Sequence, residues 1–143
     1  MTKVFLDANV LIDIIDASRP YSEQSSRLFT ALVENIERYE LFTSCDLMTT
    51  VYYILTKQIE KKEVLEQLKV LNQIITVVEF GNREIDEAIS LMQRDKKFQD
   101  LEDTIQFIMA RKSSCKYIIT NDKNFFSHEI MLLNTNQALE HLL

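Results

Sequence analysis

The sequence predicts an α/β fold in which a mostly parallel sheet is covered by helices on both faces. Short apolar runs rich in β-branched residues alternate along the 143 residues with longer segments whose apolar side chains recur at helical spacing. This alternation favours parallel pairing, because the helix that joins two parallel strands packs back onto the sheet. One glycine and one proline in the whole chain agree with many helices and short connections.

The first half of the chain predicts two strands and four helices. A first strand covers residues 3–7, and we expect Asn9 to cap a short helix that ends near Asp16. We expect Ser22 to cap the second helix, whose apolar positions at helical spacing extend to Ile36. The remaining predicted segments are a strand at 41–44, a helix at 47–55, a charged connection at 57–62 and a helix that ends near residue 73.

The second half predicts three strands and three helices from the same alternation. The β-branched run at 74–80 is typical of a strand. The segments that follow are a helix from Asn82, a polar loop at 94–100, a helix at 101–113, strands at 117–120 and 131–133, and a final helix capped by Thr135. No repeat or change of composition divides the chain, so we expect residues 1–143 to form a single domain.

The composition excludes several classes of function. The net charge is −6, and clustered Lys and Arg are needed to coat nucleic acid non-specifically, so that mode of binding is not expected. Gly81 is the only glycine. The chain therefore lacks the glycine-rich loop with which dinucleotide folds and P-loops hold phosphates.

The ends and the cysteines predict a cytoplasmic protein. Cys45 and Cys115 are far apart in the sequence, and they indicate neither a disulfide framework nor a zinc motif. The N-terminus runs directly into the first predicted strand without an apolar leader. No apolar run approaches the ~20 residues that a membrane span requires, so we expect no membrane contact.

Four polar clusters are expected to bring acids or amides to one edge of the sheet. They are 4–9 (VFLDAN), 43–46 (TSCD), 100–103 (DLED) and 118–122 (IITND). An Asp that directly follows a buried parallel strand lies where open α/β sheets build their sites. Carboxylates gathered there remain charged only if a cation neutralises them. The pattern therefore predicts a site for a hard divalent metal ion.

Three of these clusters also have a purely structural interpretation. Asp7 and Asn9 are typical of an Asx turn followed by a helix cap. Asp100 and Asp103 are three residues apart and favour the positive N-terminal end of a helix. Asp122 lies in the turn-rich sequence Asn-Asp-Lys-Asn. The joint occurrence of the clusters, rather than any single one, favours a metal site.

Three segments resemble the motifs of the PIN domain family of nucleases. They are 7–13 (DANVLID), 101–106 (LEDTIQ) with Ala110 beyond it, and 119–125 (ITNDKNF), in the family's order and spacing over nearly the whole chain. The resemblance implies a three-layer α/β/α sandwich. It also implies a metal-dependent endoribonuclease that uses Mg²⁺ or Mn²⁺.

The same resemblance implies the roles of individual residues. Asp7, Asp103 and Asp122 would hold the metal and act in hydrolysis of an RNA phosphodiester, in which a bound water attacks phosphorus. Asp100 would act beside them. The residues expected to orient water or the metal ligands are Asn9, Thr120 and Asn121.

One position departs from the family pattern. The family usually has a Glu, sometimes an Asp, on the helix after the second strand, and counting from Ser44 places Thr50 there. Asp46 lies one helical turn earlier and is expected to face the same way. We therefore expect Asp46, the Thr50 hydroxyl or a water to take the place of the absent acid. The change weakens a second metal position more than the first.

The PIN resemblance also implies partners. Many members are toxins of bacterial toxin–antitoxin pairs, so the implied partners are an RNA substrate and an antitoxin protein, and homodimers are common in the family. Such antitoxins usually lay a helix in an apolar groove. We expect a helical hairpin formed by 21–37 and 47–55 to provide that groove.

Two other functions remain open from the sequence. A phosphatase would use Asp7 as its nucleophile, but such enzymes place a second acid two residues later, where this chain has Asn9, and a glycine-rich turn beside the late acids. A PIN-like fold with Thr50 in place of its usual Glu would serve instead as a catalytically weak or inactive module that binds RNA or protein.

Overall fold

A five-stranded sheet forms the centre of the computed structural model, which describes residues 1–143. Its order is β3-β2-β1-β4-β5, and every pairing is parallel. The strands are β1 (Thr2–Leu6), β2 (Tyr39–Ser44), β3 (Thr76–Val78), β4 (Tyr117–Ile119) and β5 (Met131–Leu133). The predicted α/β class is confirmed, and the sheet is entirely rather than mostly parallel.

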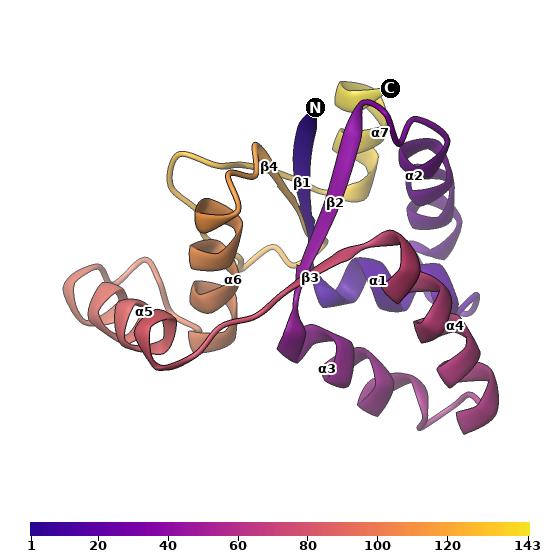
Figure 1. Cartoon of the computed structure of the whole chain (residues 1–143), viewed down its shortest axis with the longest axis horizontal. Helices are drawn as coiled ribbons and strands as arrows, with labels where there is room; N and C mark the ends of the chain where they lie inside the picture. Colours follow the sequence, from indigo (N-terminus) through magenta and orange to yellow (C-terminus); the bar gives the residue numbers. More distant parts are fainter.

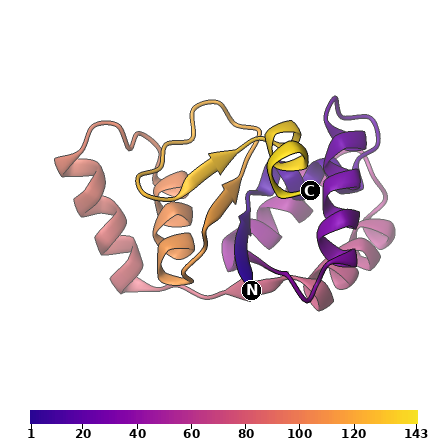
Figure 2. The ribbon, with the colours of Figure 1, turned by 90° about the horizontal axis from the view of Figure 1, so that it is seen from above.

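Seven helices cover this sheet on both faces (Figures 1 and 2). They are α1 (Ala8–Ile15), α2 (Ser22–Glu34), α3 (Cys45–Leu55), α4 (Lys61–Ile74), α5 (Asn82–Arg94), α6 (Leu101–Lys112) and α7 (Thr135–Leu142). Figure 2 shows α5 and α6 on one side of the sheet and α2 and α4 on the other. The predicted three-layer sandwich is confirmed. No helix combines the length and the apolar character that crossing a bilayer requires.

The topology places a reversal of strand order beside β1. The chain adds β2 and β3 on one side of β1 and then crosses to add β4 and β5 on the other side. Ligands of open α/β sheets bind at the carboxyl ends of the strands where such a reversal occurs. The segments that follow β1 and β4 begin with Asp7 and Thr120, so these two positions face each other at the reversal.

The core explains why β1 and α6 hold this edge rigidly. Val4, Phe5 and Leu6 of the central strand are almost fully buried, as expected of a strand covered on both faces. Helix α6 is buried without interruption from Thr104 to Ala110, because it packs between the sheet and α5. Burial of such side chains stabilises the fold by roughly 1.5–3 kcal/mol each.

Three predicted caps lie one or two residues away from the observed ones. Asp7, rather than Asn9, caps α1, and its side chain accepts a hydrogen bond from the Ala8 N–H. Asn134, rather than Thr135, caps α7 and forms a capping box with Gln137. The prediction of Ser22 was also wrong, since Ser22 is the first residue of α2 and no side chain caps that helix.

Two further predictions differ in extent and packing. The third strand is shorter than 74–80, because Ile74 ends α4 and only Thr76–Val78 pair with β2. The predicted hairpin of 21–37 and 47–55 is not the principal packing on this side. Helix α1 packs on both α2 and α3, while α3 packs on α4 and α2 packs on α7.

A buried polar network fixes the loop after β4. Asp13 of α1 is 2% exposed, and its carboxylate accepts hydrogen bonds from Arg19 Nε at 2.7 Å, Asn121 Nδ2 at 3.0 Å and Ser25 Oγ at 3.3 Å. Asn121 also donates to Thr135 Oγ1 at 2.8 Å and accepts from the Thr135 N–H at 3.0 Å. The network therefore joins α1, α2, the loop after β4 and the start of α7.

We expect Asp13→Ala to lower the free energy of unfolding by about 2–4 kcal/mol, because it leaves Asn121 and Arg19 without their buried partner. Chemical denaturation measures the change. Asp86→Ala removes the same charge from an exposed position of α5 and serves as the control. Equal stability of the two variants would contradict the anchoring role of Asp13.

A candidate metal centre at the carboxyl edge of the sheet

Asp7 is the most buried acid at this edge, with 5% of the residue exposed. Its Oδ1 accepts from the Ala8 N–H at 2.7 Å, and its Oδ2 accepts from Thr120 Oγ1 at 2.7 Å and from Asn9 Nδ2 at 2.9 Å. Burial raises the pKa of Asp7, and repulsion from Asp122 adds to the rise, whereas the hydrogen bonds oppose it. The carboxylate is thus held in one orientation in a place where its charge is unfavourable.

Asn9 and Thr120 tie the ends of β1 and β4 together. Asn9 Nδ2 donates to Thr120 Oγ1 at 3.1 Å as well as to Asp7, and Asn9 Oδ1 accepts from the Asn121 N–H at 3.0 Å. Thr120 Oγ1 in turn accepts from the Asp122 N–H at 3.1 Å. The structure therefore brings together four of the predicted site residues after β1 and β4. Asn9 and Thr120 bond Asp7 directly, and Asn121 and Asp122 bond these two residues.

The start of α6 brings two more acids to the same edge. Asp100 Oδ1 accepts from the Asp103 N–H at 2.9 Å, so Asp100 is the N-cap of α6, as its structural interpretation predicted. The pKa of Asp103 is raised to about 7. Burial is the largest cause, and repulsion from neighbouring acids adds to it, namely from Asp7, Asp100, Asp122 and Glu102. Repulsion of this kind requires proximity, so Asp103 lies among these acids.

Asp122 stabilises a turn and also lies near the other acids. Its Oδ1 accepts from the Asn124 N–H at 2.9 Å, which agrees with the turn predicted there, and the residue is exposed. Asp122 nevertheless raises the pKa values of both Asp7 and Asp103 by repulsion. It therefore stands at the rim of the site, while Asp7 lies inside it.

Thr50, at the position of the absent family acid, bonds the backbone of Asp46, and the Asp46 carboxylate lies near Glu102. Thr50 donates its hydroxyl to the Asp46 carbonyl at 3.2 Å, and Ser44 Oγ donates to Asp46 Oδ1 at 2.6 Å. The surrounding protein raises the pKa of Glu102, and repulsion from Asp46, Asp7 and Asp100 adds to it. Glu102 was not among the predicted site residues. Its place between Asp100 and Asp103 in one acidic turn was the available signal.

The donor set fits a hard divalent cation held partly through water. Carboxylate, amide and hydroxyl oxygens are the ligands that Mg²⁺ and Mn²⁺ prefer. No three His, Cys, Asp or Glu side chains lie close enough together to hold one ion between them. Mg²⁺ is commonly held by one or two carboxylates, with waters and substrate phosphates completing its shell. The spacing of these acids fits that mode rather than a cage made only of protein ligands.

Gln106 is a buried amide without a hydrogen-bond partner, one helical turn after Asp103. Its side chain is fully buried, and neither its amide nitrogen nor its amide oxygen has a partner. It lies three residues after Asp103 on the same face of α6, and helical side chains tilt towards the N-terminus, hence towards Asp103. An unpaired buried amide is costly unless a water or ion shell satisfies it. Sequence reasoning gave Gln106 no role.

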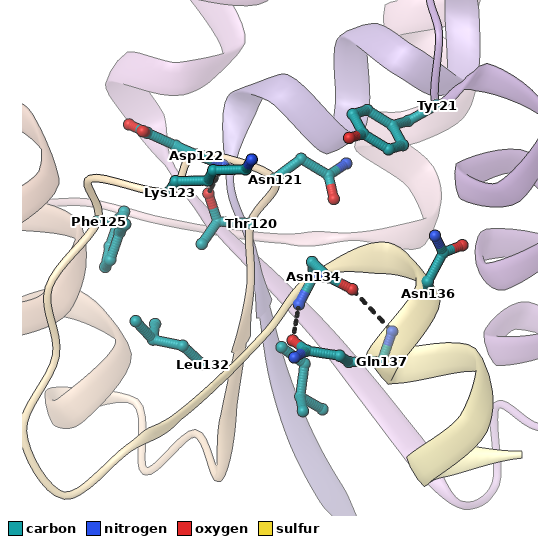
Figure 3. Close-up of a pocket in the computed structure, with 11 residues that line it drawn as sticks. Tyr21, Thr120, Asn121, Asp122, Lys123, Phe125, Leu132, Asn134, Asn136 and Gln137 are labelled. Atoms are coloured by element: carbon teal, nitrogen blue, oxygen red, sulfur yellow. Dashed lines mark hydrogen bonds between the residues drawn. The ribbon is translucent and has the colours of Figure 1, made fainter.

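A hollow of about 240 Å³ opens next to the acids (Figure 3). It is lined by side chains from three segments, which are Tyr21 before α2, the loop 120–125 after β4, and residues 132–137 around the start of α7. Thr120 and Asp122 belong to both the hollow and the acidic site. The two features therefore share one wall.

The charge at Asp103 predicts a pH-dependent stability of the metal-free protein. An acid with a raised pKa in the folded state favours folding below its unfolded pKa near 3.8, and this contribution is lost as the pH rises to about 7. We expect Asp103→Asn to stabilise the protein in EDTA by about 1–3 kcal/mol at pH 8, and by much less at pH 5. Denaturant unfolding at both pH values measures this. An equal effect at the two pH values would contradict the assigned repulsion.

The unpaired amide predicts opposite effects of Gln106→Leu on stability and on metal binding. Removal of a buried group without partners is expected to raise the free energy of unfolding of the metal-free protein by about 1–2 kcal/mol. Loss of a group that supports the ligand shell is expected to weaken Mn²⁺ binding roughly tenfold. Calorimetry and thermal unfolding measure both, with the exposed Gln67→Leu on α4 as control. A destabilised variant with unchanged Mn²⁺ affinity would contradict this role.

Comparison with known proteins agrees with the geometry. The PIN domain family matches residues 3–124. Ribonuclease VapC1 of Aquifex aeolicus (strain VF5) is 44% identical over 138 residues, which are 96% of this chain and 94% of that protein.

Solved structures share the fold at low sequence identity. The Mycobacterium tuberculosis toxin VapC20, described as cleaving the Sarcin-Ricin loop, is 14% identical with a TM-score of 0.72, covering 89% of this chain and 98% of that one. VapBC2 from Rickettsia felis, bound to promoter DNA, is 14% identical with a TM-score of 0.70, covering 93% and 98%. With the family match, the curated relative and the acids at the sheet edge in agreement, this chain belongs to the PIN domain family.

Proposed function

We propose that this protein is an endoribonuclease that hydrolyses RNA phosphodiester bonds with the help of Mg²⁺ or Mn²⁺. The observation that carries the proposal is the gathering of Asp7, Asp103 and Asp122, from three distant segments, at one edge of the sheet. A relative with 44% identity that is named a ribonuclease supports the same activity. The proposed ligand set is Asp7 and Asp103 directly or through water, with Asp122 at the rim.

The fixed orientation of Asp7 suits it to hold a cation. Three hydrogen bonds determine the direction of its carboxylate, and their donors are Ala8, Asn9 and Thr120. A bound divalent cation supplies positive charge to the phosphate oxygens in the transition state and lowers the pKa of a coordinated water. The Asp7 carboxylate is already ordered before substrate binds, so little reorganisation would be needed to hold the cation.

Asp103 can exchange a proton near neutral pH in the metal-free protein, since its pKa is raised to about 7. In its ionised form it would help to hold the cation and would accept a hydrogen bond from the water that attacks phosphorus. Asp100 caps α6 and fixes the backbone of Asp103, so its proposed role is to position that residue. Asn121 is held by Asp13 and Thr135 and keeps the loop after β4 in place.

The family usually has an acid at the position of Thr50, and Asp46 and Glu102 are its proposed substitutes. The Thr50 hydroxyl donates to the backbone, whereas Asp46 and Glu102 keep carboxylates close enough to repel each other. Their proposed effect is to attract a second cation more weakly than a Glu at position 50 would. One firmly held cation and one weak position are therefore expected.

An antitoxin protein is the proposed partner, because several related structures are toxin–antitoxin assemblies. One is described as a toxin-antitoxin complex from Klebsiella pneumoniae and another as VapBC-1 from nontypeable Haemophilus influenzae. Large apolar side chains are exposed on α3 and α4, among them Tyr53, Ile54 and Leu65. These helices are the proposed contact for such a partner or for a second copy of the chain.

An inactive binding module is the second candidate, and Thr50 is the observation that favours it. The retention of buried Asp7 beside Asp103 argues for an active site, since clustered acids without a cation destabilise the fold. The phosphatase interpretation loses its basis, because the chain belongs to the PIN domain family and its relative with 44% identity is named a ribonuclease.

RNA cleavage by the purified protein tests the proposal. We expect cleavage of RNA with Mn²⁺ or Mg²⁺ and none in EDTA. Asp7→Asn and Asp103→Asn are expected to reduce the rate roughly 100-fold or more, because each removes a carboxylate that holds the cation. Asp122→Asn is expected to have a smaller effect, since this residue is exposed at the rim. Gel analysis of a mixed-sequence RNA measures the rates.

Two further variants sharpen this test. Asp86→Asn removes a charge from α5, away from the site, and is expected to keep the full rate. Thr50→Glu restores the family acid and is expected to raise the rate if the weak second position limits it. Unchanged activity in both Asp7→Asn and Asp103→Asn would remove the proposed site.

A further inference from the structure

We propose that the hollow beside the acids is a subsite for one unpaired nucleobase of the RNA, and that it prefers a base that carries carbonyl oxygens, such as uracil, over adenine. This inference rests on the proposed ribonuclease function. The hollow is formed by Tyr21, the loop 120–125 and residues 132–137 (Figure 3).

Its position suits a base adjacent to the phosphate that is cleaved. Thr120 donates a hydrogen bond to Asp7 Oδ2 at 2.7 Å and also lines the hollow. Asp122 belongs to the rim of the acidic site and to the same lining. An RNA strand with its phosphate at Asp7 therefore has this hollow next to it, on the other side of Thr120.

Its size and floor suit one base rather than a base pair. The cavity of about 240 Å³ is smaller than the roughly 300–1,000 Å³ of pockets for drug-sized ligands. Phe125 and Leu133 are buried beneath it, and Leu132 lies beside them, so the floor is apolar. Recognition of single-stranded RNA commonly combines such apolar contact with hydrogen bonds to the edge of an unstacked base.

The rim presents two side-chain amides, Asn134 and Gln137, whose oxygens already accept hydrogen bonds and whose amino groups remain free to donate. Asn134 Oδ1 accepts from the Gln137 N–H at 2.8 Å, and Gln137 Oε1 accepts from the Asn134 N–H at 2.9 Å (Figure 3). Their side-chain amino groups have no partner in the structure, and neither does Lys123 Nζ. Three free donors favour acceptor atoms on the ligand. The edge of uracil offers two carbonyl oxygens, whereas the edge of adenine offers only ring nitrogens beside an amino group that is itself a donor.

Tyr21 and Arg19 extend the subsite towards the RNA backbone. Tyr21 is 42% exposed and lines both this hollow and a second one that contains Asn9, Arg19 and Asp122. Arg19 uses Nε to bind Asp13, which leaves its terminal amino groups for a phosphate. An aromatic ring beside a cation is a common arrangement for single-stranded nucleic acid, in which bases stack and phosphates pair with the cation.

Binding of short RNAs in EDTA, where no cleavage occurs, tests the inference. Fluorescence anisotropy is measured with labelled oligo(U) and oligo(A), and we expect oligo(U) to bind roughly tenfold more tightly. Gln137→Glu keeps the oxygen that caps α7 but replaces the free amino group with an acceptor. We expect this variant to lose the preference for oligo(U) while its melting temperature is unchanged or higher, because a Glu is favourable in the first turn of a helix.

A matched variant separates base recognition from charge. Gln67→Glu adds the same negative charge on an exposed position of α4 and is expected to keep the preference for oligo(U). Tyr21→Ala is expected to weaken the binding of both RNAs at least fivefold. Tyr21→Phe is expected to bind them as the unaltered protein does, because it keeps the stacking ring.

The outcomes distinguish the subsite from the proposed function. Equal binding of oligo(U) and oligo(A) by the unaltered protein, or identical behaviour of Gln137→Glu and Gln67→Glu, would overturn the subsite while leaving metal-dependent RNA cleavage intact. Absence of binding to either RNA, together with absence of cleavage, would overturn the subsite and the proposed function alike.

Discussion

Repulsion among carboxylates at the carboxyl edge of β1 and β4 is the constraint on which the rest of the site depends. Asp7 is buried there by the packing of the central strand, and Asp103 is carried to it by a helix that is itself core. Burial first, and then repulsion from these acids, raises the pKa of Asp103 to about 7. The apolar core supplies the stability that tolerates this charge, and a divalent cation is the natural means of removing the repulsion.

One loop connects this charge to the recognition of a ligand. Asn121 is fixed from behind by Asp13 and Thr135, which leaves its neighbours Thr120 and Asp122 in defined positions. Thr120 orients Asp7, while the same loop forms a wall of the polar hollow. A shared wall of this kind couples the place where a phosphate would bind to the place where a base would bind.

The fold and most of the acidic positions could be predicted from the sequence, because buried parallel strands leave continuous apolar runs that end abruptly on polar residues. The caps could not be placed to the residue. Asp7 and Asn9 are both good capping residues, and only the backbone decides between them. Asn134 and Thr135 present the same ambiguity at α7.

Residues that act through contacts between distant segments escaped prediction. Asp13 belongs to an ordinary amphipathic helix in the sequence, and only the fold places Asn121 and Arg19 against it. Glu102 has the pattern of a surface acid in a first helical turn, although Asp46 from another segment lies near enough to repel it. Gln106 ends the 101–106 motif but received no role, since an unpaired buried amide is defined by what surrounds it.

Calorimetric titration of Mn²⁺ into the purified protein tests the central claim most directly. At pH 7 the unaltered protein is predicted to bind one ion firmly and to release protons as it does so, because Asp103 must ionise, so the measured heat changes with the ionisation enthalpy of the buffer. Asp7→Asn is predicted to abolish this binding, and Asp86→Asn to leave it intact. Absence of Mn²⁺ binding by the unaltered protein, or equal binding by Asp7→Asn, would contradict the account.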